Sequence, residues 1–273
     1  MIRVATVNVN GIRAARRKGM DQWLATCGAD VVLAQETRAP EDVTAKLMGE
    51  DWHVVTFPSQ LKGRAGVAVA CRADSGIEIV SAEREAIADE HESDSGRWLE
   101  ATLHLSGREA PLRVVSAYLH SGQVGSPKLD YKLSHLARVE ERLAQLAADG
   151  VDTVVAGDFN VVRSQFDIKN WKGNHNKTSG VLDEEIAFLD RWMGGDWVDV
   201  TRQLTGPEVP GPYTWWSWRG KAFDNDAGWR IDYQMATPAL AERARAVRVD
   251  RAPAYDQRFS DHAPLVVDYA LDQ

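Results

Sequence analysis

The sequence predicts an α/β protein in which two β-sheets pack face to face and helices cover their outer surfaces. Short β-branched or alternating runs, bounded by glycine, proline or charged residues, predict strands. Several of these runs follow one another closely, as in hairpins, whereas helical patterns separate other groups of runs. This mixture argues against a purely parallel, doubly wound sheet. We therefore expect two mixed, mainly antiparallel sheets.

The expected strands share β-branched residues and sharp ends. They cover residues 4–9, 30–34, 53–57, 66–70, 98–105, 112–118, 153–156 and 264–269. The expected helices share an amphipathic pattern. They cover residues 20–27, 41–48, 128–148 and 182–193. The third helix has the clearest limits, because Ser126 and Pro127 begin it and Gly150 ends it.

The length and composition favour one compact domain over residues 1–273, although the length would also permit two. The chain has 273 residues, 44% of them hydrophobic, so it can bury a large core. Cys27 and Cys71 are too few for a disulfide scaffold and too isolated for a zinc cluster. No run approaches the roughly 18 apolar residues of a membrane span. We expect a monomeric, cytoplasmic protein that does not enter a membrane.

The net charge of -8 argues against a broadly basic surface for nucleic acid. Local charge differs from the total, because Arg13, Arg16, Arg17 and Lys18 cluster near the start of the chain. Residues 170–177 are also basic and polar, and they contain no acid. These segments are either a path for a phosphate backbone or ordinary solvated loops.

The most informative motif is Gly157-Asp158-Phe159-Asn160, which directly follows the apolar run at 153–156. Four more polar clusters follow or interrupt strand-like runs. They are Asn8-Val9-Asn10-Gly11, Gln35-Glu36-Thr37, Trp229-Arg230-Ile231-Asp232-Tyr233 and Ser260-Asp261-His262. If these clusters meet at one edge of the sheets, their carboxylates, amides and histidine form a metal-assisted phosphoryl site in outline.

Hard oxygen ligands suit Mg²⁺ or Mn²⁺, and Mg²⁺ uses one or two carboxylates together with waters. Glu36 and Asp261 are the candidate metal ligands, and Asn8 completes or orients the ligand set. Each has an ordinary alternative, because an acid after a strand is often a helix cap and an Asn in a turn often bonds its own backbone.

Asp158 and Asn160 are two residues apart, so on an extended segment both side chains point to the same face. We expect Asp158 to be the base that activates or positions the nucleophile and Asn160 to be a donor that orients it. The alternative is an Asx turn that closes the strand.

His262 and Asp232 form a second expected pair, because a histidine held by a remote carboxylate stays protonated more readily. A charged imidazole facing a phosphate would stabilise the transition state. Tyr118 could donate its phenolic hydrogen to the same phosphate, or it could be a core or rim tyrosine.

Tryptophan is abundant, with 10 in the chain, and Trp215, Trp216, Trp218 and Trp229 lie in a short stretch. Indole rings stack on a sugar or base and can wall a pocket. Core packing explains some of them, but Trp215 and Trp229 flank the segments expected to carry the chemistry.

Taken together, these residues resemble the exonuclease III and apurinic/apyrimidinic endonuclease family of the endonuclease/exonuclease/phosphatase superfamily. The resemblance runs through nearly the whole chain. It is carried by residues 8–14, Gln35-Glu36-Thr37, Tyr118, Gly157-Asp158-Phe159-Asn160, residues 228–233 and Ser260-Asp261-His262.

The resemblance implies a four-layer α/β sandwich and Mg²⁺-dependent hydrolysis of double-stranded DNA, either 5′ of an abasic site or stepwise from a 3′ end. It implies three groups of site residues. The metal-binding group is Asn8, Glu36, Asp158, Asn160, Asp261 and His262. The catalytic group is Tyr118, Asp158, Asn160, Asp232 and His262. The DNA-binding group is Asn10, Arg13, Arg38, Asn174, Trp215 and Trp229.

Two other functions remain open. A related phosphatase or phosphodiesterase would act on a small phosphoester such as a phosphorylated inositol, but inositol phosphatases usually carry Cys-Asp-Arg where this chain has Arg230-Ile231-Asp232. An inactive DNA-binding module should have lost an essential acid, yet Glu36, Asp158, Asp232, Asp261 and His262 are all present.

Overall fold

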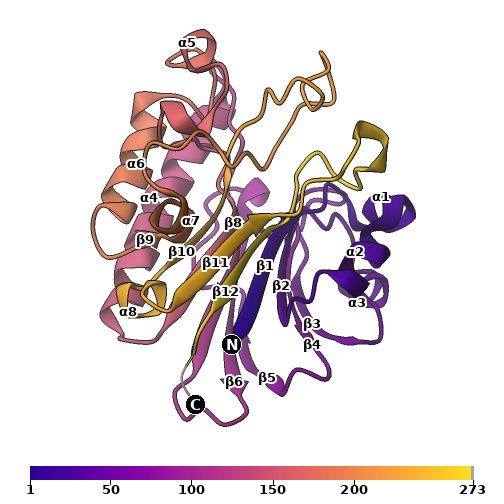
Figure 1. Ribbon diagram of the computed structural model, residues 1–273. Helices are drawn as coiled ribbons and strands as arrows, with labels where there is room; N and C mark the ends of the chain where they lie inside the picture. The colour runs from indigo at the N-terminus through magenta and orange to yellow at the C-terminus, as the bar shows by residue number, and fades with distance from the viewer. Residues whose placement is uncertain (272–273) are drawn as a thin grey trace.

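Two six-stranded β-sheets form the centre of the protein in the computed structural model, which describes residues 1–271 (Figure 1). The first sheet has the spatial order β11 (Ala244–Val249), β12 (Leu265–Tyr269), β1 (Ile2–Asn8), β2 (Val31–Gln35), β4 (Val67–Arg72) and β3 (Trp52–Phe57). The second has the order β5 (Ile77–Glu83), β6 (Trp98–Leu105), β7 (Leu112–Tyr118), β8 (Thr153–Asp158), β10 (Asp232–Ala236) and β9 (Val198–Asp199). β1 is parallel to β2, and β7 to β8, whereas the other neighbours pair antiparallel. The expectation of mixed, mainly antiparallel sheets is confirmed.

Helices cover the outer faces of both sheets and give the protein four layers (Figure 1). α1 (Ile12–Ala15), α2 (Asp21–Thr26) and α3 (Glu41–Met48) pack on the first sheet, and α4 (Pro127–Ala148) and α6 (Asp183–Met193) pack on the second. Shorter helical segments lie in the connections. They are η1 (Arg16–Met20), η2 (Glu92–Asp94), η3 (Gln165–Asp167), α5 (Trp171–Asn174), α7 (Val200–Thr205), α8 (Pro238–Ala241) and η4 (Tyr255–Gln257). The four-layer sandwich is confirmed.

The alternation of side chains along each strand explains why both faces of a sheet are apolar. In β8, Val154 lies in the cluster between the sheets, together with Leu33 and Leu99. Its neighbour Val155 lies in the outer cluster with Leu136 of α4. Successive side chains of a strand point to opposite faces, so an unbroken apolar run is the pattern for a strand that is buried on both sides.

Every strand and helix expected from the sequence is present, with ends shifted by two residues or fewer. β5, β9, β10 and β11 fall outside the expected strands. β5 and β11 are edge strands with exposed charged residues, which obscure the apolar alternation. β9 has two residues, and β10 is buried throughout although it begins with Asp232 and contains Gln234. Among residues 1–271, no helix is both long enough and apolar enough to cross a membrane.

A buried arginine ties the start of β10 to two distant segments. The Arg230 side chain donates to Asp167 Oδ1 over 2.6 Å and to the two Asp199 oxygens over 3.2 and 2.9 Å. All three side chains are nearly fully buried, and the guanidinium lies 4.5 Å from the centre of the Tyr233 ring. Asp167 also pairs with Arg202, whereas Asp199 pairs with Arg230, so removing Arg230 leaves buried Asp199 without its guanidinium and Asp167 with Arg202 alone.

We therefore predict that Arg230→Met lowers the free energy of unfolding by about 3–5 kcal/mol, because buried Asp199 loses its guanidinium partner and Asp167 keeps only Arg202. Urea unfolding followed by circular dichroism measures the change. The matched control is Arg191→Met, which breaks an exposed pair with Glu140. We expect a loss of less than about 1 kcal/mol for that control. Equal losses in the two variants would contradict the role given to the buried network.

Candidate active site

The strand ends carry the polar clusters to one end of the two sheets. Asn8 ends β1 and pairs with Gln35 of the parallel strand β2, which places Glu36 beside it. In the second sheet Tyr118 ends β7 and pairs with Asp158 at the end of the parallel strand β8. Parallel neighbours present their carboxyl ends at the same edge, so the topology gathers these side chains.

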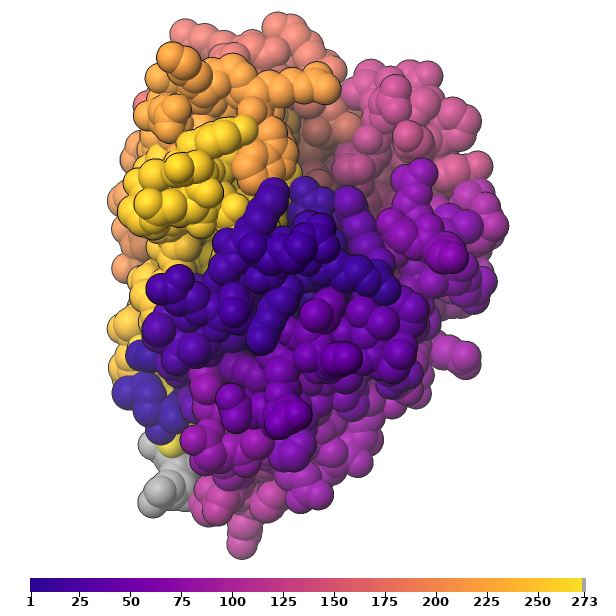
Figure 2. Space-filling model, turned by 90° about the vertical axis from the view of Figure 1, so that its right-hand side faces the viewer, coloured from indigo at the N-terminus to yellow at the C-terminus, as the bar shows by residue number. Residues whose placement is uncertain are grey.

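These side chains line a cavity of about 720 Å³. The cavity corresponds to the recess in the upper part of Figure 2, where segments from both halves of the chain face one another. Most of the residues expected at the site lie on its wall. They are Asn8, Asn10, Glu36, Arg38, Tyr118, Asp158, Asn160, Trp215, Trp229, Asp261 and His262.

The close approach of β8 to β7 requires a glycine at position 157. Its φ is 149°, and a Cβ at this position would stand 1.8 Å from the carbonyl oxygen of Ala117. Glycine therefore lets β8 approach β7 closely just before both strands deliver their polar side chains, Asp158 and Tyr118.

The centre of the site is a buried group of two carboxylates and one imidazole. His262 Nδ1 lies 2.9 Å from Asp232 Oδ2, and His262 Nε2 lies 3.7 Å from Asp158 Oδ2. β10 brings Asp232 directly opposite Asp158. Asn8 donates from Nδ2 to the same Asp158 oxygen over 2.9 Å. The expected pairing of His262 with Asp232 is thus present, although Asp232 lies behind the imidazole rather than on the cavity wall.

The surrounding charges set the protonation of this group. Burial lowers the pKa of His262, but the charges of Asp232 and Asp158 outweigh burial and raise the pKa to about 10. Burial raises the pKa of Asp158 to about 7, and Asp232 and Glu36 add to the rise against the opposing effect of His262. His262 is therefore a cation at neutral pH, while Asp158 is poised to accept a proton.

Glu36 and Tyr118 form the second part of the site. The Tyr118 hydroxyl and the Arg38 guanidinium both donate to the Glu36 carboxylate. Burial raises the pKa of Tyr118 well above its usual value, and the Glu36 charge raises it further. Tyr118 is thus a neutral hydrogen-bond donor throughout the physiological range.

Asp261 lies on the same wall, between Asn10 and Trp215. Its Oδ1 accepts from Asn10 Nδ2 over 2.8 Å, and its Oδ2 accepts from the Trp215 indole over 3.1 Å. Burial raises the pKa of Asp261, but the charge of His262 and these hydrogen bonds outweigh burial and lower it. Asp261 is therefore an ionised carboxylate.

The expectation that residues 158–160 are extended is wrong. Asn160 has a φ of 53°, in the left-handed region, and its backbone N–H donates to Asp158 Oδ1 over 2.9 Å. The segment forms the Asx turn that was the alternative expectation. The side-chain amide of Asn160 donates to the Leu119 carbonyl over 3.0 Å. The side chains of Asp158 and Asn160 nevertheless both line the cavity.

Two residues expected to contact DNA lie outside the main cavity. Arg13 lines a neighbouring groove together with Arg38, Lys62 and Arg64. Asn174 ends α5, where its side chain donates to the Asn170 carbonyl and accepts from Thr178.

Several loop residues that were not among the expected site residues also line the cavity. They are Arg64, Ser121, Gly122, Gln123, Lys177, Thr178 and Ser179. The acid-free stretch at residues 170–177 was a signal for Lys177, and the resemblance pointed to the segment after Tyr118, but loops that join the site from far away carry no periodic pattern.

Trp215 and Trp229 form the aromatic wall. Their rings meet edge to face with centroids 5.5 Å apart, and their backbones form an antiparallel bridge. Trp215 also bridges to His262. The aromatic wall is thus joined directly to the segment that supplies the imidazole.

The donor set suits a hard divalent cation. Glu36, Asp158 and Asp261 offer carboxylate oxygens to one cavity, and Asn8 offers an amide oxygen. Behind them, Asp232 Oδ1 is buried and has no hydrogen-bond partner. The acids outnumber the nearby cations His262 and Arg38, so a bound divalent ion would relieve the repulsion between them.

Comparisons with known proteins agree with this chemistry. A model of the endonuclease/exonuclease/phosphatase family matches residues 5–262. An exodeoxyribonuclease of Bacillus subtilis is 30% identical over 94% of this chain and 95% of its own length. The DNA repair nuclease APEX1 of Danio rerio is 30% identical over 99% of this chain and 83% of its own length. The structure of an AP endonuclease from Archaeoglobus fulgidus superposes with a TM-score of 0.81, at 29% identity, covering 99% of this chain and all of that one.

We predict that in chelator-treated protein His262 loses its proton only near pH 10, and that Asp232→Asn lowers this pKa, because Asp232 is the main group that raises it. The protonated His262 stabilises the folded state, because its pKa there lies above the ordinary value of 6.5. This contribution to the free energy of unfolding is complete below pH 6.5 and is lost as the pH rises through about 10.

Imidazole resonances followed by NMR through a pH titration measure this pKa. The control is Glu140→Gln, which changes an acid on the exposed face of α4 and should leave His262 unaffected. A wild-type His262 that titrates near 6.5 would contradict the prediction.

Proposed function

Because the chain belongs to the endonuclease/exonuclease/phosphatase family, we propose that it is a Mg²⁺-dependent DNA-repair nuclease that hydrolyses phosphodiester bonds, 5′ of abasic sites or at 3′ ends. The observation that carries the proposal is the meeting of Asp158, His262 and Glu36 in one cavity beside an aromatic wall. Double-stranded DNA that carries abasic sites or 3′ ends is the proposed partner.

Asp158 is the proposed base. It takes a proton from the attacking water, because burial places its pKa close to neutrality. Asn8 and the Asn160 backbone each donate to Asp158, and so hold the carboxylate in one orientation. The water oxygen attacks phosphorus, and the bond from phosphorus to the 3′ oxygen breaks.

His262 and Tyr118 are the proposed donors to the phosphate. Asp232 keeps His262 protonated from behind, so Nε2 presents a charged N–H beside Asp158. Tyr118 contributes a neutral O–H from the end of β7. Donors that are already oriented before the reaction stabilise the transition state without reorganisation.

Mg²⁺ is the proposed cofactor, and Mn²⁺ should substitute because it prefers similar ligands. Glu36 and Asp261 would hold the ion, while Asn8, Asp158, Asn160 and His262 complete or orient the site. A bound ion would neutralise charge on the phosphoryl oxygens and on the leaving oxygen.

The aromatic wall is the proposed pocket for an extruded abasic sugar. Trp215 and Trp229 offer flat apolar surface beside the phosphate donors, and extrusion is easiest where no base must be unstacked. Asn10, Arg13, Arg38 and Asn174 are the proposed contacts to the DNA backbone. Arg13 and Arg38 share a groove next to the cavity, which gives the acidic chain a local cationic surface.

We also propose that the chain works as one domain and as a monomer, since each proposed role falls to a residue of the same chain. A reducing compartment such as the cytoplasm suits the thiols of Cys27 and Cys71, which are buried and free.

The proposal predicts that a duplex with one abasic analogue is cut 5′ of the lesion in Mg²⁺ and stays intact in chelator. Asp158→Asn should lower turnover by roughly 10²–10⁴-fold, because the base is removed. Its dissociation constant for the duplex should change little, since transition-state rather than ground-state contacts are lost. Asp196→Asn, at an exposed acid away from the cavity, is the matched control.

Intact DNA at saturating Mg²⁺ would refute the nuclease proposal. Release of inorganic phosphate from inositol phosphates, with no DNA cut, would support the small-phosphoester alternative instead. Equal losses of turnover and binding in Asp158→Asn would point to misfolding.

A further prediction concerns the aromatic wall. Trp229→Ala should lower kcat/KM on the abasic duplex by about tenfold, because the extruded sugar loses apolar contact with the indole face. Removal of nucleotides from 3′ ends should fall less. Trp218→Ala is the control, since that ring meets Tyr255 edge to face and lies outside the cavity. A parallel loss on both substrates in Trp229→Ala would argue against a pocket for the abasic sugar.

A further inference from the structure

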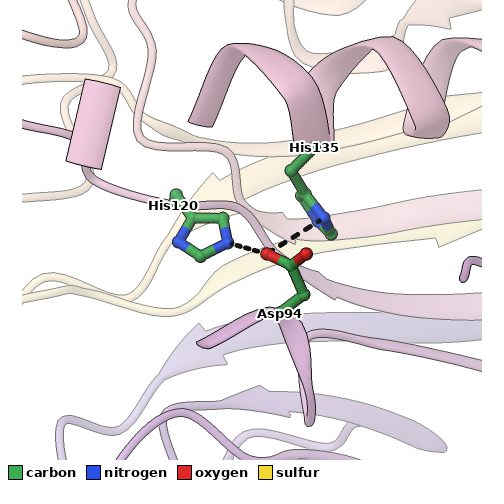
Figure 3. Close-up of side chains that lie close together, drawn as sticks. All are labelled: Asp94, His120 and His135. Carbon is green, nitrogen blue, oxygen red and sulfur yellow. Dashed lines mark hydrogen bonds and ion pairs between the residues drawn. The ribbon is translucent and has the colours of Figure 1, made fainter. Parts of the chain in front are cut away.

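A second buried cluster of ionisable side chains, formed by Asp94, His120 and His135, lies outside the cavity (Figure 3). Asp94 ends η2, His120 follows β7 by two residues, and His135 lies in α4. Their exposed fractions are 3%, 8% and 2%. Three elements that are distant in the sequence thus bring two imidazoles and a carboxylate together inside the protein.

His135 is the feature that needs an explanation. Both of its ring nitrogens are buried and neither has a hydrogen-bond partner. Buried polar atoms are almost always bonded, so an imidazole with two unpartnered nitrogens indicates a missing ligand. Its Nδ1 points toward Asp94 Oδ1, but the 4.0 Å between them is too long for a hydrogen bond.

We propose that Asp94, His120 and His135 bind a divalent transition-metal ion of the Zn²⁺ class. One donor atom from each residue lies within 4.8 Å of the others. Zn²⁺ with ligands at about 2.0–2.1 Å in a tetrahedron separates its donor atoms by about 3.3 Å. The two distances from Asp94 Oδ1 are 2.7 Å to His120 Nε2 and 4.0 Å to His135 Nδ1. They bracket that value, so small side-chain shifts produce the coordination geometry.

The outer contacts also fit a metal ligand. Asp94 Oδ2 accepts from the Arg138 guanidinium over 2.6 Å and from the backbone N–H groups of Glu90 and His91 over 3.1 Å. These donors occupy one carboxylate oxygen and leave Oδ1 for the ion, an arrangement common around ligating carboxylates. Arg138 also pairs with Glu90, so its charge is balanced by two acids.

The cluster and the cavity differ in the type of ligand atom that they offer to a metal ion. Imidazole nitrogens favour Zn²⁺ and related ions, whereas Mg²⁺ prefers sites made of oxygen. The cluster would therefore keep its ion in an excess of Mg²⁺. Because residues 121–124 follow His120 and line the cavity, the ion would fasten one wall of that cavity to α4 and η2.

The first test is crystallographic. Crystals soaked in Zn²⁺ with excess Mg²⁺ are measured at the zinc absorption edge. We expect an anomalous peak among Asp94, His120 and His135. Zinc scattering only beside Asp158 and His262, or none at either place, would overturn the proposal. This test is independent of nuclease activity.

The second test measures Zn²⁺ affinity in solution by competition with a chromogenic chelator, again in excess Mg²⁺. His120→Gln and His135→Gln should each weaken binding by more than about 100-fold, because losing a direct ligand costs more than the roughly 10–100-fold of an outer partner. His104→Gln, at an exposed histidine of β6, should bind as the wild type does.

Circular dichroism shows whether each variant folds. If the His135→Gln variant does not fold, the His120→Gln variant tests the proposal, because the His120 side chain is the more exposed of the two. Affinity equal to that of the wild type in a folded variant would overturn the proposal.

Discussion

The opposition of Asp158 and Asp232 across β8 and β10 is the constraint on which the site depends. Strand pairing forces the two carboxylates to face each other in the interior, where water cannot screen them. His262 lies against both carboxylates, and its positive charge offsets the repulsion between them. The same arrangement explains the chemistry, because it yields a charged imidazole and a carboxylate that is close to accepting a proton. Stability and reactivity therefore come from one set of contacts.

The charge of the whole molecule and the charge of its proposed binding face have different consequences. A net charge of -8 disfavours indiscriminate binding to a polyanion. The cations that matter are placed locally, with Arg13, Arg38 and Arg64 in one groove and Lys177 on the cavity wall. DNA would thus be bound mainly where it can also be cut, which limits non-productive association.

Tyr118 connects the cavity with the cluster of Asp94, His120 and His135. Its hydroxyl donates to Glu36 in the cavity, while its carbonyl accepts from Arg97, three residues after Asp94. The Arg97 guanidinium also lies 4.6 Å from the centre of the Tyr118 ring. The proposed phosphate donor is therefore supported from behind by the segment that holds the histidine cluster.

The sequence alone determined the local structure and the inventory of chemical groups, because strand and helix patterns depend on neighbouring residues. It placed Glu36, Asp158, Asp261 and His262 at strand ends and predicted the layers correctly. It did not give the positive φ of Asn160, the strands β5, β9, β10 and β11, or the position of Thr178 on the cavity wall. Only the tertiary structure decided the remaining contacts: that Asp158 lies beside His262 and opposite Asp232, and that His120 meets His135 and Asp94. These contacts join residues far apart in the chain, and their energies depend on burial and distance, which no local pattern encodes.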